Sequence, residues 1–164
     1  MERRAFLLLP ALSMPLIQEQ LSPTGWRRLV AVYPRIALTG VVNSGKTLLL
    51  EEGGRGTPPK EVIHTDVLSR KDWPTIPSKI CSTVTGKESF IVVGTQVPRC
   101  LRKGLEVDAL VWLNTSRTGL DSRQEGFGKG IRKIMHAWRH QHPEIPVYFS
   151  PRALHDRELA RMPE

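Results

Sequence analysis

The chain has 164 residues, which is enough for one domain with a two-sided core and too few for a second enzyme. It carries 24 Lys and Arg against 16 Asp and Glu, a net charge of +8, which suits a polyanionic ligand such as a nucleoside triphosphate, a phosphorylated acceptor or nucleic acid. Aromatic residues make up 6%, and no basic stripe is interleaved with them, so a dedicated platform for single-stranded nucleic acid is disfavoured.

We expect residues 1–34 to form an N-terminal extension and residues 151–164 a polar tail or terminal helix. The charged start MERR and the apolar run after it imitate a secretory signal, but Pro10 and Pro15 interrupt the run and no small-x-small cleavage site follows. We therefore expect a packed or mobile extension on a cytoplasmic protein. The chain has no run of about 20 apolar residues, so we predict no membrane span.

Residues 35–150 are predicted to form one α/β domain with a parallel five-stranded sheet and helices on both faces. Apolar and β-branched runs predict strands at residues 35–39, 61–65, 89–93, 107–113 and 145–149. Helices are expected over residues 22–32, from near Gly45 to the loop at 53–59, and over residues 75–85, 97–105 and 122–140. Strands that alternate with helices predict right-handed crossovers and a ligand at the carboxyl ends of the strands.

The most specific motif is GVVNSGKT at residues 40–47, an unbroken match to G-x-x-x-x-G-K-[ST] directly after the first strand of that domain. In such a phosphate loop the glycines turn backbone N–H groups onto the phosphates, the lysine reaches the β- and γ-phosphates, and the hydroxyl residue ligates Mg²⁺. The predicted ligands are therefore ATP and Mg²⁺. The predicted binding residues are Gly40, Val41, Val42, Asn43, Ser44, Gly45, Lys46 and Thr47.

Asp66 ends the second strand of the domain, on the sheet edge where the first strand delivers the loop. A carboxylate there could orient or deprotonate an acceptor hydroxyl, or bind Mg²⁺ through water. Together with Thr47 it forms the predicted metal site. The alternative is that Asp66 caps the next helix.

These segments, with His64-Thr-Asp66, the run Gly94-Thr-Gln-Val-Pro-Arg99 and residues 124–132, resemble the P-loop kinase-like proteins of the nucleoside monophosphate kinase and zeta-toxin type. The resemblance covers roughly residues 35–149, and the phosphate loop is its most specific part.

The resemblance implies roles for four basic residues. Arg99, with Arg102 as a neighbour, would contact the phosphate of the acceptor, and Arg123 and Lys129 would belong to a basic helical lid over the donor phosphates. The alternative for each of these bases is a solvated surface position.

Proteins of that type usually carry Asp or Glu at the end of the third strand, where this chain has Val93. We predict an ATP-dependent phosphotransferase that acts on a small hydroxyl or phosphate acceptor, with Lys46, Asp66, Arg99 and Arg123 as its catalytic residues. Val93 keeps open a nucleotide-binding protein without transferase activity, and the positive charge keeps open an ATPase associated with nucleic acid.

Overall fold

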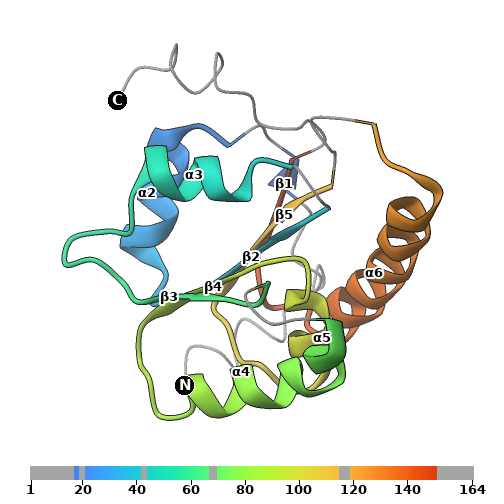
Figure 1. Cartoon of the computed structure of the whole chain (residues 1–164). Helices are drawn as coiled ribbons and strands as arrows, with labels where there is room; N and C mark the ends of the chain where they lie inside the picture. The colour runs from blue at the N-terminus through green and yellow to red at the C-terminus, as the bar shows by residue number, and fades with distance from the viewer. Residues whose placement is uncertain (1–16, 19–20, 42–43, 67–69, 115–118, 151–164) are drawn as a thin grey trace.

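The computed structural model describes residues 17–18, 21–41, 44–66, 70–114 and 119–150. This part of the chain forms a six-stranded parallel sheet with helices on both faces (Figure 1), which confirms the predicted α/β class. The strand order is β1-β6-β5-β2-β4-β3.

The five predicted strands are all present. They are β2 (Arg35–Gly40), β3 (Val62–His64), β4 (Phe90–Val93), β5 (Ala109–Leu113) and β6 (Val147–Ser150). Strand β2 lies near the centre, because β4 pairs with it on one side and β5 on the other. A two-residue strand that we did not predict, β1 (Ile17–Gln18), pairs with β6.

The helices follow the predicted pattern with shifts at their ends. They are α2 (Pro23–Val32), α3 (Lys46–Gly53), α4 (Ile76–Val84), α5 (Val97–Arg102) and α6 (Ser122–Gln141), together with a 3₁₀ helix that we did not predict, η1 (Arg70–Thr75). At the start of α2 the Ser22 side chain accepts the Gly25 N–H at 3.0 Å, as its capping role predicts. No helix in the described residues is long and apolar enough to cross a membrane.

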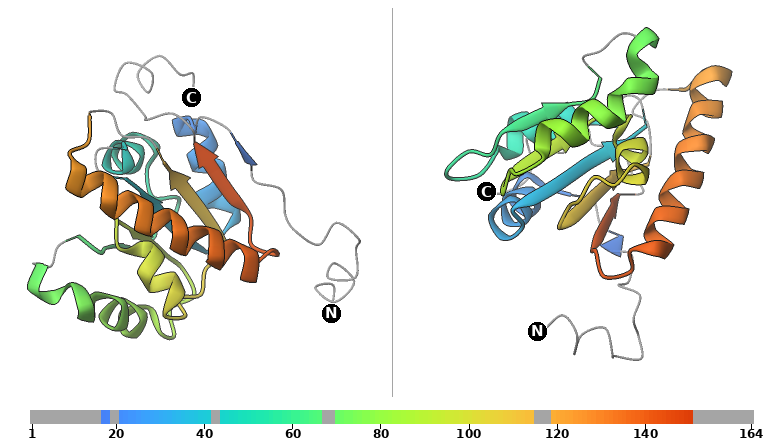
Figure 2. Two further views of the ribbon diagram at one scale, coloured as in Figure 1. Left: turned by 90° about the vertical axis from the view of Figure 1, so that its right-hand side faces the viewer. Right: turned by 90° about the horizontal axis from the view of Figure 1, so that it is seen from below.

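Two apolar cores lie on opposite faces of the sheet, between it and the helices that Figures 1 and 2 show on either side. Helices α4, α5 and α6 cover one face, and α2 and α3 cover the other. Because alternate residues of a strand point to opposite faces, Phe90 and Val92 belong to the first core while Ile91 and Val93 belong to the second.

Part of the segment that we assigned to an N-terminal extension belongs to the second core. Leu21, Trp26 and Val30 are buried there. The Trp26 indole Nε1 donates to the carbonyl oxygen of Gly54 at 2.7 Å, which ties α2 to the end of α3. Helix α2 therefore supports the helix that follows the 40–47 loop.

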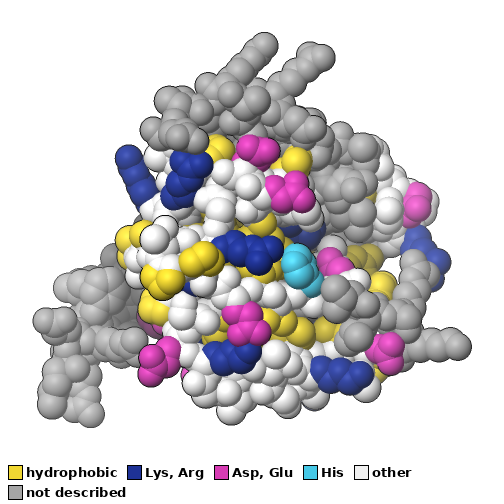
Figure 3. All heavy atoms as spheres, turned by 60° about the vertical axis from the view of Figure 1, so that its left-hand side comes forward, with side chains coloured by type: hydrophobic (Ala, Val, Ile, Leu, Met, Phe, Trp, Pro, Cys, Tyr) yellow, Lys and Arg dark blue, Asp and Glu magenta, His cyan; other side chains and the backbone are white. Residues whose placement is uncertain are grey.

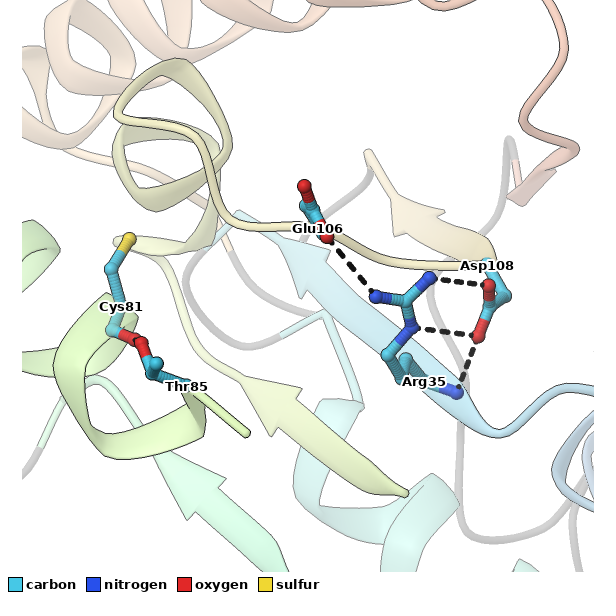
Figure 4. Close-up of polar contacts among 5 residues, drawn as sticks. All are labelled: Arg35, Cys81, Thr85, Glu106 and Asp108. Carbon is cyan, nitrogen blue, oxygen red and sulfur yellow. Dashed lines mark hydrogen bonds and ion pairs between the residues drawn. The ribbon is translucent and has the colours of Figure 1, made fainter. Parts of the chain in front are cut away.

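An ion pair between Arg35 and Asp108 joins the amino-terminal ends of β2 and β5 (Figure 4). Arg35 donates from Nη2 to Asp108 Oδ1 at 2.9 Å and from Nε to Asp108 Oδ2 at 3.1 Å, the two-pronged arrangement that suits a guanidinium. The Arg35 backbone N–H also donates to Asp108, at 3.0 Å. Strand β5 begins at Ala109, directly after this ion pair and two residues later than predicted.

Both cysteines, Cys81 and Cys100, are free. Cys81 lies on α4 and Cys100 on α5, and burial raises the pKa of the Cys100 thiol to about 12. Cys100 is therefore a packing residue in its neutral form.

Candidate functional site

Residues 40–47 join β2 to α3 at the carboxyl edge of the sheet, where open parallel sheets bind their ligands. Gly40 ends β2, and a Cβ there would overlap the Leu113 carbonyl oxygen and lie 2.5 Å from Ser44 Oγ, so the site needs glycine. Val41 donates its N–H to the same Leu113 oxygen at 3.1 Å. Gly45 precedes α3 with a φ of 97°. Val42 and Asn43 lie outside the described residues.

The Lys46 ammonium is folded back onto the loop. Its Nζ donates to the carbonyl oxygens of Gly40 at 3.1 Å and Val41 at 2.8 Å, and to Ser44 Oγ at 3.3 Å. Burial lowers the pKa of Lys46 from 10.5 to about 8, while the nearby charge of Asp66 acts to raise it. Lys46, the predicted phosphate-binding cation, and Asp66, the predicted carboxylate, therefore lie near each other at the carboxyl edge of the sheet.

Thr47 lies in the first turn of α3 with its side chain exposed. Asp66 is also exposed, just beyond the end of β3. An exposed hydroxyl and an exposed carboxylate on neighbouring elements are oxygen donors of the kind that Mg²⁺ takes.

The Asp66 carboxylate binds the turn between β4 and α5. It accepts the Thr95 backbone N–H at 3.1 Å to Oδ1 and 3.2 Å to Oδ2, and the Thr95 hydroxyl at 2.9 Å to Oδ1. The Thr65 hydroxyl donates to the same oxygen at 3.0 Å. Asp66 therefore steadies a turn 29 residues further along the chain, a role that its position in the sequence does not reveal.

Close packing joins the carboxyl ends of three strands at this point. A Cβ on Gly94 would overlap Thr65 Oγ1 and lie 2.9 Å from Asp66 Oδ1, so only glycine lets β3 and β4 approach in this way. On the other side, the Thr39 hydroxyl of β2 donates to the Gly94 carbonyl oxygen at 3.0 Å. Sequence analysis did not identify Thr39, Thr65 or Thr95 as members of the site.

Val93, the residue in the place of an acidic strand end, is only 3% exposed and belongs to the core beneath α2 and α3. It lies opposite Leu38 of β2 and His64 of β3 in the sheet. The side chain at this position therefore packs with apolar neighbours.

Arg99 lies on α5 between two aromatic rings. Its guanidinium carbon is 6.0 Å from the ring centroid of Trp73 and 5.6 Å from that of Phe127, within the range of cation–π attraction. All three line a groove of about 1530 Å³ that runs between α5 and α6. The exposed neighbour Arg102 lines the same groove. The groove extends to Arg35 and Asp108 at the amino-terminal edge of the sheet, and its lining includes neither Asp66 nor a described residue of the 40–47 loop.

Helix α6 passes the 40–47 loop at Gly128, where a Cβ would lie 3.8 Å from Val41 Cγ1 and 3.8 Å from Arg132 Nη1. The two predicted lid residues, Arg123 and Lys129, are exposed on α6. The guanidinium of Arg132, a residue for which we predicted no role, therefore lies close to Gly128, the point where α6 passes the loop.

The body of α6 is fixed to the sheet. Ile131, Met135 and Trp138 are buried in the core, as the helical spacing predicts. A capping box begins the helix, in which Gln124 N–H donates to Asp121 at 2.8 Å and Asp121 N–H donates to Gln124 at 3.1 Å. A closing movement of this helix over the donor phosphates stays a prediction.

On the face shown in Figure 3, basic and acidic side chains are interspersed, and hydrophobic side chains appear between them. A phosphate backbone is usually tracked by a continuous basic stripe or patch. The distribution of charge on this face therefore gives no support to a nucleic-acid groove.

Comparison of the sequence with protein-family models finds no matching family, and comparison with curated proteins finds no similar protein.

Proposed function

We propose that the protein binds Mg·ATP at the 40–47 loop and transfers the γ-phosphoryl group to a small acceptor that carries a hydroxyl or a phosphate. The observation that carries the proposal is the position of Lys46, a half-buried ammonium at the carboxyl edge of a parallel sheet, within a loop of the G-x-x-x-x-G-K-T pattern. A half-buried cation whose hydrogen bonds to the described residues all go to neutral oxygens is ready to bind a polyanion.

In this proposal the start of α3 and the loop N–H groups bind the phosphates, since a helix N-terminus favours negative charge. Lys46 leaves the Gly40 and Val41 carbonyl oxygens and binds the β- and γ-phosphates. Gly40 matters because its missing Cβ lets the loop lie against Leu113. Arg123 and Lys129 add positive charge from α6, and Arg132 is a further candidate for the same role.

The described residues contain no cluster of three or more His, Cys, Asp or Glu that could hold a metal ion. Mg²⁺ bound with nucleotides needs only one or two protein oxygens, because phosphates and waters complete its shell. Thr47 and Asp66 fit that need as exposed oxygen donors at one edge. When bound there, Mg²⁺ would neutralise phosphate charge.

Asp66 is the proposed base that receives the proton of an acceptor hydroxyl, and Arg99 is the proposed contact of an acceptor phosphate. Positioning and charge neutralisation would supply most of the rate acceleration. The groove beside Arg99, with Trp73 and Phe127 as its apolar walls, is the proposed acceptor side of the site.

A second candidate is a nucleotide-binding protein without transferase activity. The buried, apolar environment of Val93 favours it, because the carboxylate that related folds place there to organise the metal shell is replaced by a core residue. Binding of Mg·ATP without transfer would be its signature.

Two measurements test the proposal. Titration calorimetry with Mg·ATP should show binding by the wild type and a loss of about ten- to a hundredfold for Lys46→Ala, since removing a charge-assisted contact costs about 1.5–3 kcal/mol. Lys129→Ala is the matched control and should lose less. A panel of hydroxyl and phosphate acceptors with labelled ATP then separates a kinase from a binding protein. Equal ATP affinity in wild type and Lys46→Ala would contradict nucleotide binding at the 40–47 loop.

A further inference from the structure

Four buried side-chain polar atoms of the described residues have no hydrogen-bond partner. The side-chain atoms without a hydrogen-bond partner are Gln96 Nε2 and Oε1, Trp112 Nε1 and Asn114 Oδ1. Gln96 follows β4, whereas Trp112 and Asn114 end or follow β5, and these two strands flank β2, which leads into the 40–47 loop. Gln96 and Asn114 thus follow the carboxyl ends of two strands, at the edge of the sheet where the proposed ligand binds, whereas the Trp112 ring packs in the core.

Gln96 is the extreme case, because it is 1% exposed and both ends of its amide are unpaired among the described residues. Its backbone is fixed, since its N–H donates to Thr65 Oγ1 at 3.3 Å. The same Thr65 hydroxyl donates to Asp66, and Asp66 in turn holds Thr95, the residue before Gln96. The amide therefore belongs to the turn that the proposed base steadies.

A buried amide that makes no hydrogen bond destabilises the fold, so such a group calls for a physical reason. The amide has a donor and an acceptor in one plane. A phosphate could use only the donor and would leave Oε1 unpaired, whereas a hydroxyl could use both, donating a hydrogen bond to Oε1 and accepting one from Nε2. The pairing therefore distinguishes between the two acceptor chemistries.

We infer that the Gln96 side chain binds and orients the attacking oxygen of a hydroxyl acceptor, with water as the simplest such acceptor; this inference rests on the proposed phosphoryl transfer. In the step, the hydroxyl oxygen forms a bond to the γ-phosphorus. The bond from that phosphorus to the bridging oxygen breaks, and its electron pair leaves with ADP. The hydroxyl proton passes to the Asp66 carboxylate. Gln96 positions the oxygen and exchanges no proton.

The test compares wild type with Gln96→Met, which keeps the size of the side chain and removes both polar ends. Gln141→Met, at the exposed end of α6, is the matched control. Thermal melts without ligand are measured first. Calorimetry then gives the affinity for Mg·ADP alone and for Mg·ADP with aluminium fluoride, which imitates the phosphoryl group in transit with a water in line.

We expect Gln96→Met to melt about 2–4 °C higher than wild type, because an unpaired amide is removed. Its affinity for Mg·ADP should stay within about twofold, while the complex with aluminium fluoride should weaken roughly tenfold, the worth of one hydrogen bond. Gln141→Met should change none of the three.

The inference is overturned if Gln96→Met melts lower or fails to fold, because the amide would then be bonded in the free protein. It is also overturned if the variant binds the aluminium fluoride complex as tightly as wild type, or if wild type binds Mg·ADP and gains nothing from aluminium fluoride. A wild type that does not bind Mg·ADP contradicts the proposed function and this inference with it, whereas the other outcomes leave nucleotide binding intact.

Discussion

The Lys46 ammonium lies 2.8 Å from the carbonyl oxygen of Val41, inside the loop that carries both residues. Phosphate binding therefore requires Lys46 to exchange bonds with neutral oxygens for bonds with charged ones. Charge-assisted hydrogen bonds are about twice as strong as neutral ones, so this exchange favours the ligand. In the free loop the Lys46 ammonium is hydrogen-bonded to neutral oxygens. A nucleotide therefore does not have to break a strong ion pair to bind Lys46.

The first prediction concerns proton uptake. The pKa of Lys46 is about 8 in the free protein because the side chain is buried, and bound phosphate charge must raise it. At pH 8.5 the lysine is mostly neutral when free and protonated when bound, so Mg·ATP binding should take up roughly 0.7 proton. Calorimetry in buffers of different ionisation enthalpy measures this number. Lys129→Ala should show the same uptake, and a value near zero would contradict the role of Lys46.

The second prediction concerns Asp66. Asp66→Asn should lower phosphoryl transfer by about 10²–10⁴-fold, because the amide keeps the shape but cannot take the proton. ATP affinity should change little. The control is Thr95→Val, which removes the hydroxyl that donates to Asp66 at 2.9 Å and leaves the carboxylate in place. This control should melt lower and still transfer. If both variants lose transfer equally, Asp66 acts only by holding the turn.

The third prediction concerns Arg99. Arg99→Ala should raise the KM for a phosphorylated acceptor and leave the KM for ATP nearly unchanged, and Arg99→Lys should recover only part of the loss because it lacks the guanidinium fork. Steady-state kinetics with each substrate varied in turn measure both constants. Arg28→Ala removes an exposed arginine of α2, on the other face of the sheet and outside this groove, and is the control. Unchanged acceptor kinetics in Arg99→Ala would assign Arg99 to packing against Trp73 and Phe127.

The fourth prediction concerns Val93. Val93→Glu should destabilise the protein by about 3–5 kcal/mol, because the carboxylate would be buried among apolar side chains without a cation. Thermal melts with and without Mg·ATP check it, and Val93→Gln separates the cost of charge from the cost of shape. A Val93→Glu protein that melts like wild type, or that gains stability from Mg·ATP, would mean that residue 93 reaches the metal.

The sequence predicts the sheet well because each strand of the domain is a short run of apolar or β-branched residues, and the start of α2 because Ser22 and Pro23 have local capping roles. The two-residue strand β1 has no such local pattern. Its pairing with β6 depends on the completed sheet, so no property of residues 17–18 alone could identify it.

The candidate site also contains residues that the sequence identifies and residues that it does not. The motif identifies Lys46 because its spacing is fixed by the phosphates. The contacts of Asp66 with Thr95 and the burial of Gln96 arise only when β3 and β4 come together, and these residues are about 30 positions apart. Tertiary contacts of this kind leave no periodicity in a single sequence. The orientation of Val93 could have been derived, since alternation along β4 places it on the face of Ile91.

Both edge strands of the sheet are very short, with two residues in β1 and three in β3. A long open edge exposes unpaired backbone groups that recruit another chain, so short edges discourage self-association. If residues 17–18 were removed, β6 would become the edge, with four residues facing solvent along one side. A shortened protein that begins after residue 18 should therefore aggregate more readily than the full chain, even though its 40–47 loop is intact.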